Sequence, residues 1–141
     1  MKKIIISILL LIFIAEASEE KSLYQRLGGY DSVAAVSKDF HVRLKNDHQL
    51  GRFWAYRGTD GLERELQLLI DFVCFSTDGP IMYTGRDMPT THIGMKISES
   101  DWKVFMVLLQ ETLDKFKLHQ AEQNDVITFM ESLKSSMVEV K

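Results

Sequence analysis

Histidine is the side chain best suited to bind a metal or move a proton near neutral pH, and His92 is the first candidate for such chemistry in this chain. It lies within residues 83–97, a segment punctuated by Gly85, Pro89 and Gly94. These residues predict a loop with at most a turn or two of helix. A loop histidine taken alone is more often a solvated surface residue than a metal ligand, so both interpretations are open at this point.

Three further residues have side chains that could take part in chemistry, namely His41, His48 and Cys74. His41 follows Phe40 at the flank of an apolar stripe, so we expect it at the edge of whatever that stripe covers. His41 and His48 are seven residues apart, which is too far for a shared metal without further ligands. Cys74 is the single cysteine, and its apolar neighbours predict a buried core residue that forms no intrachain disulfide. No C-x-x-C-H motif is present, which argues against a covalently attached c-type haem.

The composition is that of a globular protein. The chain has 141 residues, of which 45% are hydrophobic and 26% are charged, and this length suits one domain with its own core. The net charge of -3 and the lack of a basic patch argue against nucleic acid as a partner. Two prolines and eight glycines leave little room for a turn-rich all-β fold.

The first residues differ from the remainder. Lys2 and Lys3 precede an apolar run at residues 4–14, and the small-x-small sequence Ala15-Glu16-Ala17 follows. These parts predict a signal peptide over residues 1–17, a mature domain over residues 18–141, and export to the periplasm or the medium. The run is short for a membrane span, so we expect no stable span after cleavage. An uncleaved N-terminal anchor is the alternative.

Apolar residues recur at helical spacing through the mature chain, and no alternating apolar run indicates a strand. The pattern predicts an all-α fold with one short helix followed by four longer ones. Phe53 and Trp54 lie in a connection, where aromatic residues often close a pocket or a core edge. The first expected helix covers residues 22–27, and the second runs from Asp31 or Ser32 to about Asn46-Asp47. The third begins at Asp60, with Glu63 in the capping-box position, and stops at Asp78. The fourth begins at Ser98, with Asp101 in the capping-box position, and the fifth begins at Asn124.

An ordered set of motifs resembles the truncated haemoglobins of group I. The set is Leu27-Gly28-Gly29, Asp39-Phe40, Phe53-Trp54, Gly79-Pro80, the run YTGRDM at residues 83–88, His92, Gly94-Met95 and a capped helix near Asp101-Trp102. It covers about residues 22–138. The resemblance implies a globin-like two-over-two helical sandwich around a b-type haem, with the F helix reduced to a loop. The glycine- and proline-marked segment around His92 matches that reduced helix.

The resemblance also implies roles for individual residues. His92 is expected to be the proximal ligand, whose neutral imidazole binds the haem iron. Phe40 is expected on the distal wall, and Trp54 stands where the family stacks a phenylalanine on the porphyrin. Leu69 and Val73 are expected over the distal face. The other residues expected to contact a single non-covalent haem b are Phe53, Tyr83, Met88, Met95, Ile97, Phe105 and Met130.

His41 departs from the family pattern, which has a tyrosine after Phe40 whose hydroxyl donates to the bound gas. A neutral histidine also has one N–H donor, although its strength depends on protonation. Three alternatives are open: His41 donates to the gas, binds the iron as a sixth ligand, or points out of the pocket. The facing helix is apolar at Leu69, and Glu65 or Gln67 reaches the pocket only if the helix register differs.

Two classes of function follow from the resemblance. The first is reversible binding of dioxygen or another diatomic gas, such as nitric oxide or carbon monoxide, for transport, storage or sensing. The second is a haem enzyme that oxidises nitric oxide to nitrate or carries out peroxidase-like redox chemistry. The sequence has no flavin or NAD module, so an enzyme would need an external reductant, and this favours binding. A haem-free helical module is the remaining alternative.

Overall fold

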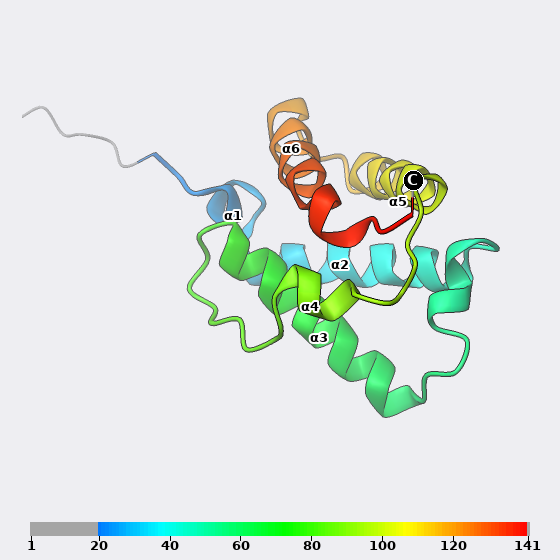
Figure 1. Ribbon diagram of the computed structural model, residues 1–141. Helices are drawn as coiled ribbons and strands as arrows, with labels where there is room; N and C mark the ends of the chain where they lie inside the picture. Colours follow the sequence, from blue (N-terminus) through cyan, green and yellow to red (C-terminus); the bar gives the residue numbers. More distant parts are fainter. Residues whose placement is uncertain (1–19, 141) are drawn as a thin grey trace, which may run out of the picture.

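The computed structural model describes residues 20–140, and this part of the chain is all-α, as predicted (Figure 1). The predicted leader and the predicted cleavage site lie outside the described residues. Across residues 20–140 no helix is long and apolar enough to cross a membrane. The elements are α1 (Leu23–Arg26), α2 (Gly29–Asn46), the 3-10 helix η1 (Leu50–Phe53), α3 (Thr59–Ser76), α4 (Met88–His92), α5 (Glu99–Lys115) and α6 (Gln120–Met137).

The four long helices form two packed pairs. α2 packs against α3, and α5 packs against α6, while α2 also contacts α5 (Figure 1). The single-turn α4 contacts α6 and is joined to its neighbours by extended connections (Figure 1). The predicted short first helix, the four longer helices and the helical turn within residues 83–97 are therefore confirmed.

The capping box predicted at Ser98 and the helix end predicted near Asn46-Asp47 are confirmed, because both depend on neighbours in the sequence. Ser98 accepts from the Asp101 backbone N–H at 3.1 Å, and the Asp101 carboxylate accepts from the Ser98 N–H at 2.9 Å. This reciprocal capping box opens α5 at the predicted residue. α2 ends at Asn46 with Asp47 as its C-cap, also as predicted.

Three predicted helix starts are wrong. α2 begins at Gly29 because Gly28, with a left-handed φ of 96°, turns the chain into the helix before Asp31 or Ser32. α3 begins at Thr59 behind an extended Gly58, so Asp60 lies inside its first turn.

α6 begins at Gln120, four residues before Asn124. The Asn124 side chain accepts from Gln120 Nε2 at 2.9 Å, so it forms a pair along the helix surface and does not cap it.

The core lies where the helix pairs meet. Phe40 contacts Phe105 edge to face, with ring centroids 5.0 Å apart, and so joins α2 to α5. A second cluster joins α2 to α3 through Val33, Ile70 and Cys74. Cys74 is fully buried, as predicted, and burial raises the pKa of its thiol. The main cluster comprises Phe40, Leu44, Leu50, Leu109, Leu113, Val126 and Met130.

Candidate functional site

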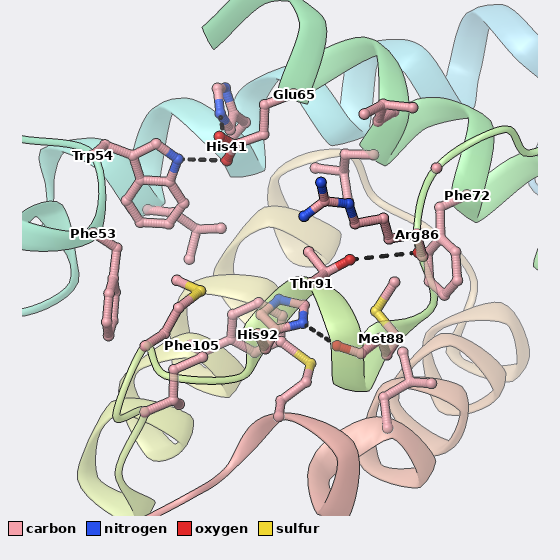
Figure 2. A pocket seen from close by; sticks show the side chains of 18 of the residues that line it. His41, Phe53, Trp54, Glu65, Phe72, Arg86, Met88, Thr91, His92 and Phe105 are labelled. Carbon is pink, nitrogen blue, oxygen red and sulfur yellow. Dashed lines mark hydrogen bonds and ion pairs between the residues drawn. The ribbon is translucent and has the colours of Figure 1, made fainter. Parts of the chain in front are cut away.

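A cavity of about 680 Å³ is lined by residues of α2, α3, α4, α5 and α6 (Figure 2). This is within the size range of cofactor and small-molecule sites. The predicted site residues that line it are Phe40, His41, Phe53, Trp54, Leu69, Tyr83, Met88, His92, Met95, Ile97, Phe105 and Met130.

Val73 was predicted in the site but does not line this cavity. It borders a smaller cavity of about 50 Å³ and packs against both core clusters. The cavity face of α3 carries Glu65, Leu68, Leu69 and Phe72, which follow helical spacing. Val73 is rotated by about 100° from Phe72 on the helix, which turns it toward α2 and the core.

α4 holds His92 in a defined orientation. The Asp87 side chain caps α4 by accepting from the Thr90 N–H at 2.7 Å. One turn on, His92 Nδ1 lies 2.9 Å from the Met88 carbonyl oxygen (Figure 2). A carbonyl only accepts, so Nδ1 carries the hydrogen and donates it. Nε2 is left with its lone pair, the form in which imidazole binds a metal.

The loop after His92 is held by the C-terminal tail. The Glu139 carboxylate accepts from the Gly94 N–H at 2.7 Å and from the Lys96 N–H at 2.5 Å. The Glu139 and Val140 N–H groups both donate to the Ile97 carbonyl oxygen, at 2.9 Å and 3.0 Å. Both hydrogen bonds lower the pKa of the Glu139 carboxyl, and the bond from the Gly94 N–H has the larger effect. The tail therefore fixes the chain that leaves α4.

The Tyr83 ring packs on the connection that precedes α4. Its hydroxyl donates to the Arg86 carbonyl oxygen at 2.8 Å, and its ring contacts Phe72 edge to face at 5.3 Å. A Cβ placed on Gly85 would lie 2.2 Å from the Tyr83 hydroxyl oxygen, so a larger residue there would require the Tyr83 ring to move.

A polar cluster forms the part of the cavity wall near α2 (Figure 2). Glu65 accepts from Trp54 Nε1 at 2.5 Å and pairs with Arg57 at 2.7 Å. His41 Nε2 lies 3.6 Å from Glu65 Oε1, and this nitrogen has no hydrogen-bond partner within the described residues. His41 is only 3% exposed, so the alternative in which it points out to solvent is wrong.

The pKa of His41 is lowered below its usual value. Burial is the largest cause, and the positive charges of Lys45 and Arg57 add to it, whereas the Glu65 carboxylate opposes the shift. Sequence reasoning anticipated the direction from desolvation. The lowered pKa favours the neutral imidazole of His41 beside the Glu65 side chain.

Glu65 reaches the cavity and Gln67 does not. Gln67 donates instead to the Tyr30 hydroxyl at 3.1 Å and to Asp71 at 2.8 Å on the exposed side of α3. Glu65 is four residues before Leu69, so helical spacing alone places both on one face. The same spacing could have identified Glu65 as a site residue.

Two arginines that sequence reasoning missed also border the cavity, namely Arg64 and Arg86. Figure 2 shows the Arg86 side chain extending toward the middle of the cavity. Within residues 20–140 neither arginine forms an ion pair. The cavity thus offers two unpaired cations at its border beside a largely apolar interior.

Asp101 ties the aromatic wall to α5. Its carboxylate accepts from Arg52 at 2.6 Å and from Gln49 at 2.8 Å, and both of these residues lie at η1. The Arg52 guanidinium also covers the Phe53 ring, 4.2 Å from its centroid. Phe53 and Trp54 are consequently held against the start of α5.

A profile of the family described as bacterial-like globin matches residues 22–139. The chain belongs to this family. Its relatives include the group 1 truncated hemoglobin GlbN of Mycolicibacterium paratuberculosis, 33% identical over 81 residues, which are 57% of each chain. The group 1 truncated hemoglobin of Tetrahymena pyriformis is 22% identical over 121 residues, covering 86% of this globin and 98% of the relative. These relatives agree with the predicted group I.

Solved structures agree on the fold. The truncated hemoglobin of Tetrahymena pyriformis in its Fe(III) form superposes with a TM-score of 0.76 at 23% identity, over 84% of this globin and 98% of that chain. The cold-adapted truncated hemoglobin of Pseudoalteromonas haloplanktis superposes with a TM-score of 0.73 at 20% identity, over 86% of this globin and 100% of that chain. The predicted two-over-two globin sandwich, with the F helix reduced to the turn of α4, is confirmed.

The cavity fits a haem by the chemistry of its lining. Methionine and aromatic side chains suit a flat apolar ring. His92 has its Nε2 lone pair available, and Arg64 and Arg86 are cations without partners at the border. Family membership and this lining both support a haem-binding globin.

Proposed function

We propose that this globin holds one haem b non-covalently through His92 and reversibly binds dioxygen or another diatomic gas on the side of His41. The observation that supports this most directly is the 2.9 Å hydrogen bond from His92 Nδ1 to the Met88 carbonyl. Metal-binding histidines commonly donate from the other ring nitrogen to such an acceptor, which fixes the tautomer. When bound, haem supplies an iron with a coordination position open to a gas.

The residues around the cavity have separable tasks in this proposal. Arg64 and Arg86 pair with the carboxylates that haem b carries. The apolar lining, which includes Met88 and Phe105, excludes water from the ring. His41 offers its N–H to the bound gas. One such hydrogen bond contributes about 1 to 2 kcal/mol, or roughly tenfold slower dissociation of the gas.

Optical spectra of the purified protein test the cofactor. We expect a haem spectrum in the ferric state and its shift on reduction and on addition of carbon monoxide. Extraction into acidified organic solvent should remove the haem completely if it is bound non-covalently. A protein that takes up no haem would contradict the proposal and leave the haem-free module.

Replacing His92 with alanine tests the proximal ligand. The cavity remains but its bond to iron is gone, so haem should wash out and the protein should lose the stability that a bound ligand gives. Added imidazole should restore the spectrum. His48→Ala is the matched control, because the His48 side chain is 93% exposed, outside the cavity. An unchanged spectrum in His92→Ala would mean that another residue binds the iron.

A further inference from the structure

The connection from α4 to α5 has little apolar packing close to His92. α4 has five residues, too few for a helix that is stable by itself, and Ile93 at its end is 76% exposed. The first buried side chain after it is Ile97, which is 7% exposed. Residues 93–96, which directly follow His92, therefore need another anchor.

The carboxylate of Glu139 supplies that anchor. Its two oxygens accept from different N–H groups, Oε1 from Gly94 at 2.7 Å and Oε2 from Lys96 at 2.5 Å. Both donor residues have a left-handed backbone, with φ of 82° and 56°. This conformation is unfavourable for Lys96, which has a Cβ, and such a residue keeps it only where its surroundings stabilise it. Turns of this kind can direct several N–H groups toward one anion.

The C-terminal tail that carries Glu139 is itself held by the long helices. It follows α6 and runs beside the connection between α4 and α5 (Figure 1), where the Glu139 and Val140 N–H groups donate to the Ile97 carbonyl oxygen. The Val140 carbonyl oxygen in turn accepts from the N–H of Glu99, the first residue of α5, at 3.0 Å. The Glu139 carboxylate thus joins the loop after His92 to both α5 and α6.

We propose that Glu139 is a positioning residue that keeps His92 on the iron when a gas binds to the opposite side of the haem. The inference rests on the proposed haem function, because His92 needs an iron to bind. His92 Nδ1 donates to the Met88 carbonyl oxygen within α4, so the imidazole moves together with this short helix. Holding the residues after α4 in place therefore limits how far the imidazole can withdraw from the iron.

Nitric oxide is the gas that tests this restraint most severely. When it binds to ferrous haem, it weakens the bond between the iron and the ligand on the opposite side. The proximal imidazole then stays bound only where the protein resists its withdrawal. Electron paramagnetic resonance distinguishes the two results, because a bound imidazole nitrogen adds its own hyperfine splitting to that of nitric oxide.

The experiment adds nitric oxide to the ferrous haem protein and to its Glu139→Ala and Glu139→Gln variants. We expect the parent to keep its imidazole and Glu139→Ala to lose it in most molecules. Glu139→Gln keeps one acceptor for the loop, so it should fall between them, and it tests the proposal even if Glu139→Ala binds haem poorly. Amide hydrogen exchange at Gly94 and Lys96 should be a few-fold faster in Glu139→Ala, because these N–H groups lose their acceptor.

Two matched variants test for a general weakening of the protein. Glu63→Ala removes an exposed carboxylate from α3. Arg26→Ala removes the ion pairs with Glu122 and Asp125 at the opposite end of α6. Both variants should keep the imidazole as the parent does. Loss of the imidazole from either one, to the extent seen in Glu139→Ala, would mean that the effect is general and would refute the role of Glu139.

The remaining outcomes are also decisive. A parent that loses its imidazole would refute the positioning role, and so would a Glu139→Ala variant that keeps it while Gly94 and Lys96 exchange faster. Unchanged exchange in Glu139→Ala would show that the carboxylate does not hold the loop, which refutes the role as well. A parent that takes up no haem or binds no carbon monoxide would instead refute the proposed function.

Discussion

Replacing Asp101 with alanine should destabilise the fold by about 3 kcal/mol, because several donors lose a buried acceptor at once. Asp101 is 2% exposed and accepts from Arg52, from Gln49 and from both the N–H and the hydroxyl of Ser98. The Arg52 side chain is 49% exposed, so water replaces much of what it loses, and its share is discounted to below about 1 kcal/mol. Gln49 and Ser98 then contribute about 1 kcal/mol each.

Thermal unfolding followed by circular dichroism measures this effect. A loss of about 3 kcal/mol should lower the Tm by roughly 10 °C for a domain of this size. Asp101→Asn keeps an acceptor for Gln49 but not the charge, so about half that shift is expected.

The pH dependence supplies a second check. Arg52 is the largest cause that holds the pKa of Asp101 far below its usual range. A lowered folded-state pKa gives stability that is present above the unfolded pKa of about 3.9 and is lost as the pH falls through the folded pKa. The difference in unfolding free energy between the parent and Asp101→Ala should therefore be constant from about pH 5 to 8 and should decrease only below about pH 4. A difference in unfolding free energy under about 1 kcal/mol at pH 7, or one that changes with pH near neutrality, would refute the reasoning.

Three further predictions concern other parts of the molecule. Glu139→Ala should release haem a few-fold faster than Glu139→Gln, because glutamine keeps one acceptor for the loop after α4. Glu63→Ala, at an exposed position, should release haem at the rate of the parent. Equal rates of haem loss in all three variants would mean that the tail does not position the proximal loop. His41→Leu should release dioxygen roughly tenfold faster than the parent. The parent's release rate should depend on pH on the acid side of pH 6.5, because burial lowers the pKa of His41, and the variant should lose this dependence. Identical rates in the two proteins would show that His41 does not contact the gas. The exported protein should begin at or near Ser18 by N-terminal sequencing, whereas full-length chain in the soluble cytoplasm would contradict export.

Features set by neighbouring residues could be predicted from the sequence. The Ser98–Asp101 capping box and the turn around Pro89 depend on contacts within a few residues, so pattern was sufficient for both. The predicted start at Asn124 was wrong for a reason of the same kind: a capping residue type can equally pair along the helix, here with Gln120.

Contacts between distant residues could not be predicted. The Glu139 carboxylate meets the Gly94 N–H across 45 positions, and Arg52 meets Asp101 across 49. No local pattern marks either pair, because exposed glutamates and arginines are common on helical surfaces. Only the packing of the helices decides which of them meet.

The two histidines of the cavity illustrate how the fold assigns different chemistry to one residue type. His92 lies one turn after the Met88 carbonyl, so a local acceptor takes the hydrogen of Nδ1 and leaves a metal-binding lone pair. His41 receives no hydrogen-bond partner at Nε2 among the described residues and faces a carboxylate from another helix. A fixed tautomer suits a permanent ligand, whereas an unpartnered nitrogen beside a charge suits a group that changes protonation. The sequence supplies both imidazoles, and the packing of α2 against α3 brings the second one beside the carboxylate of Glu65.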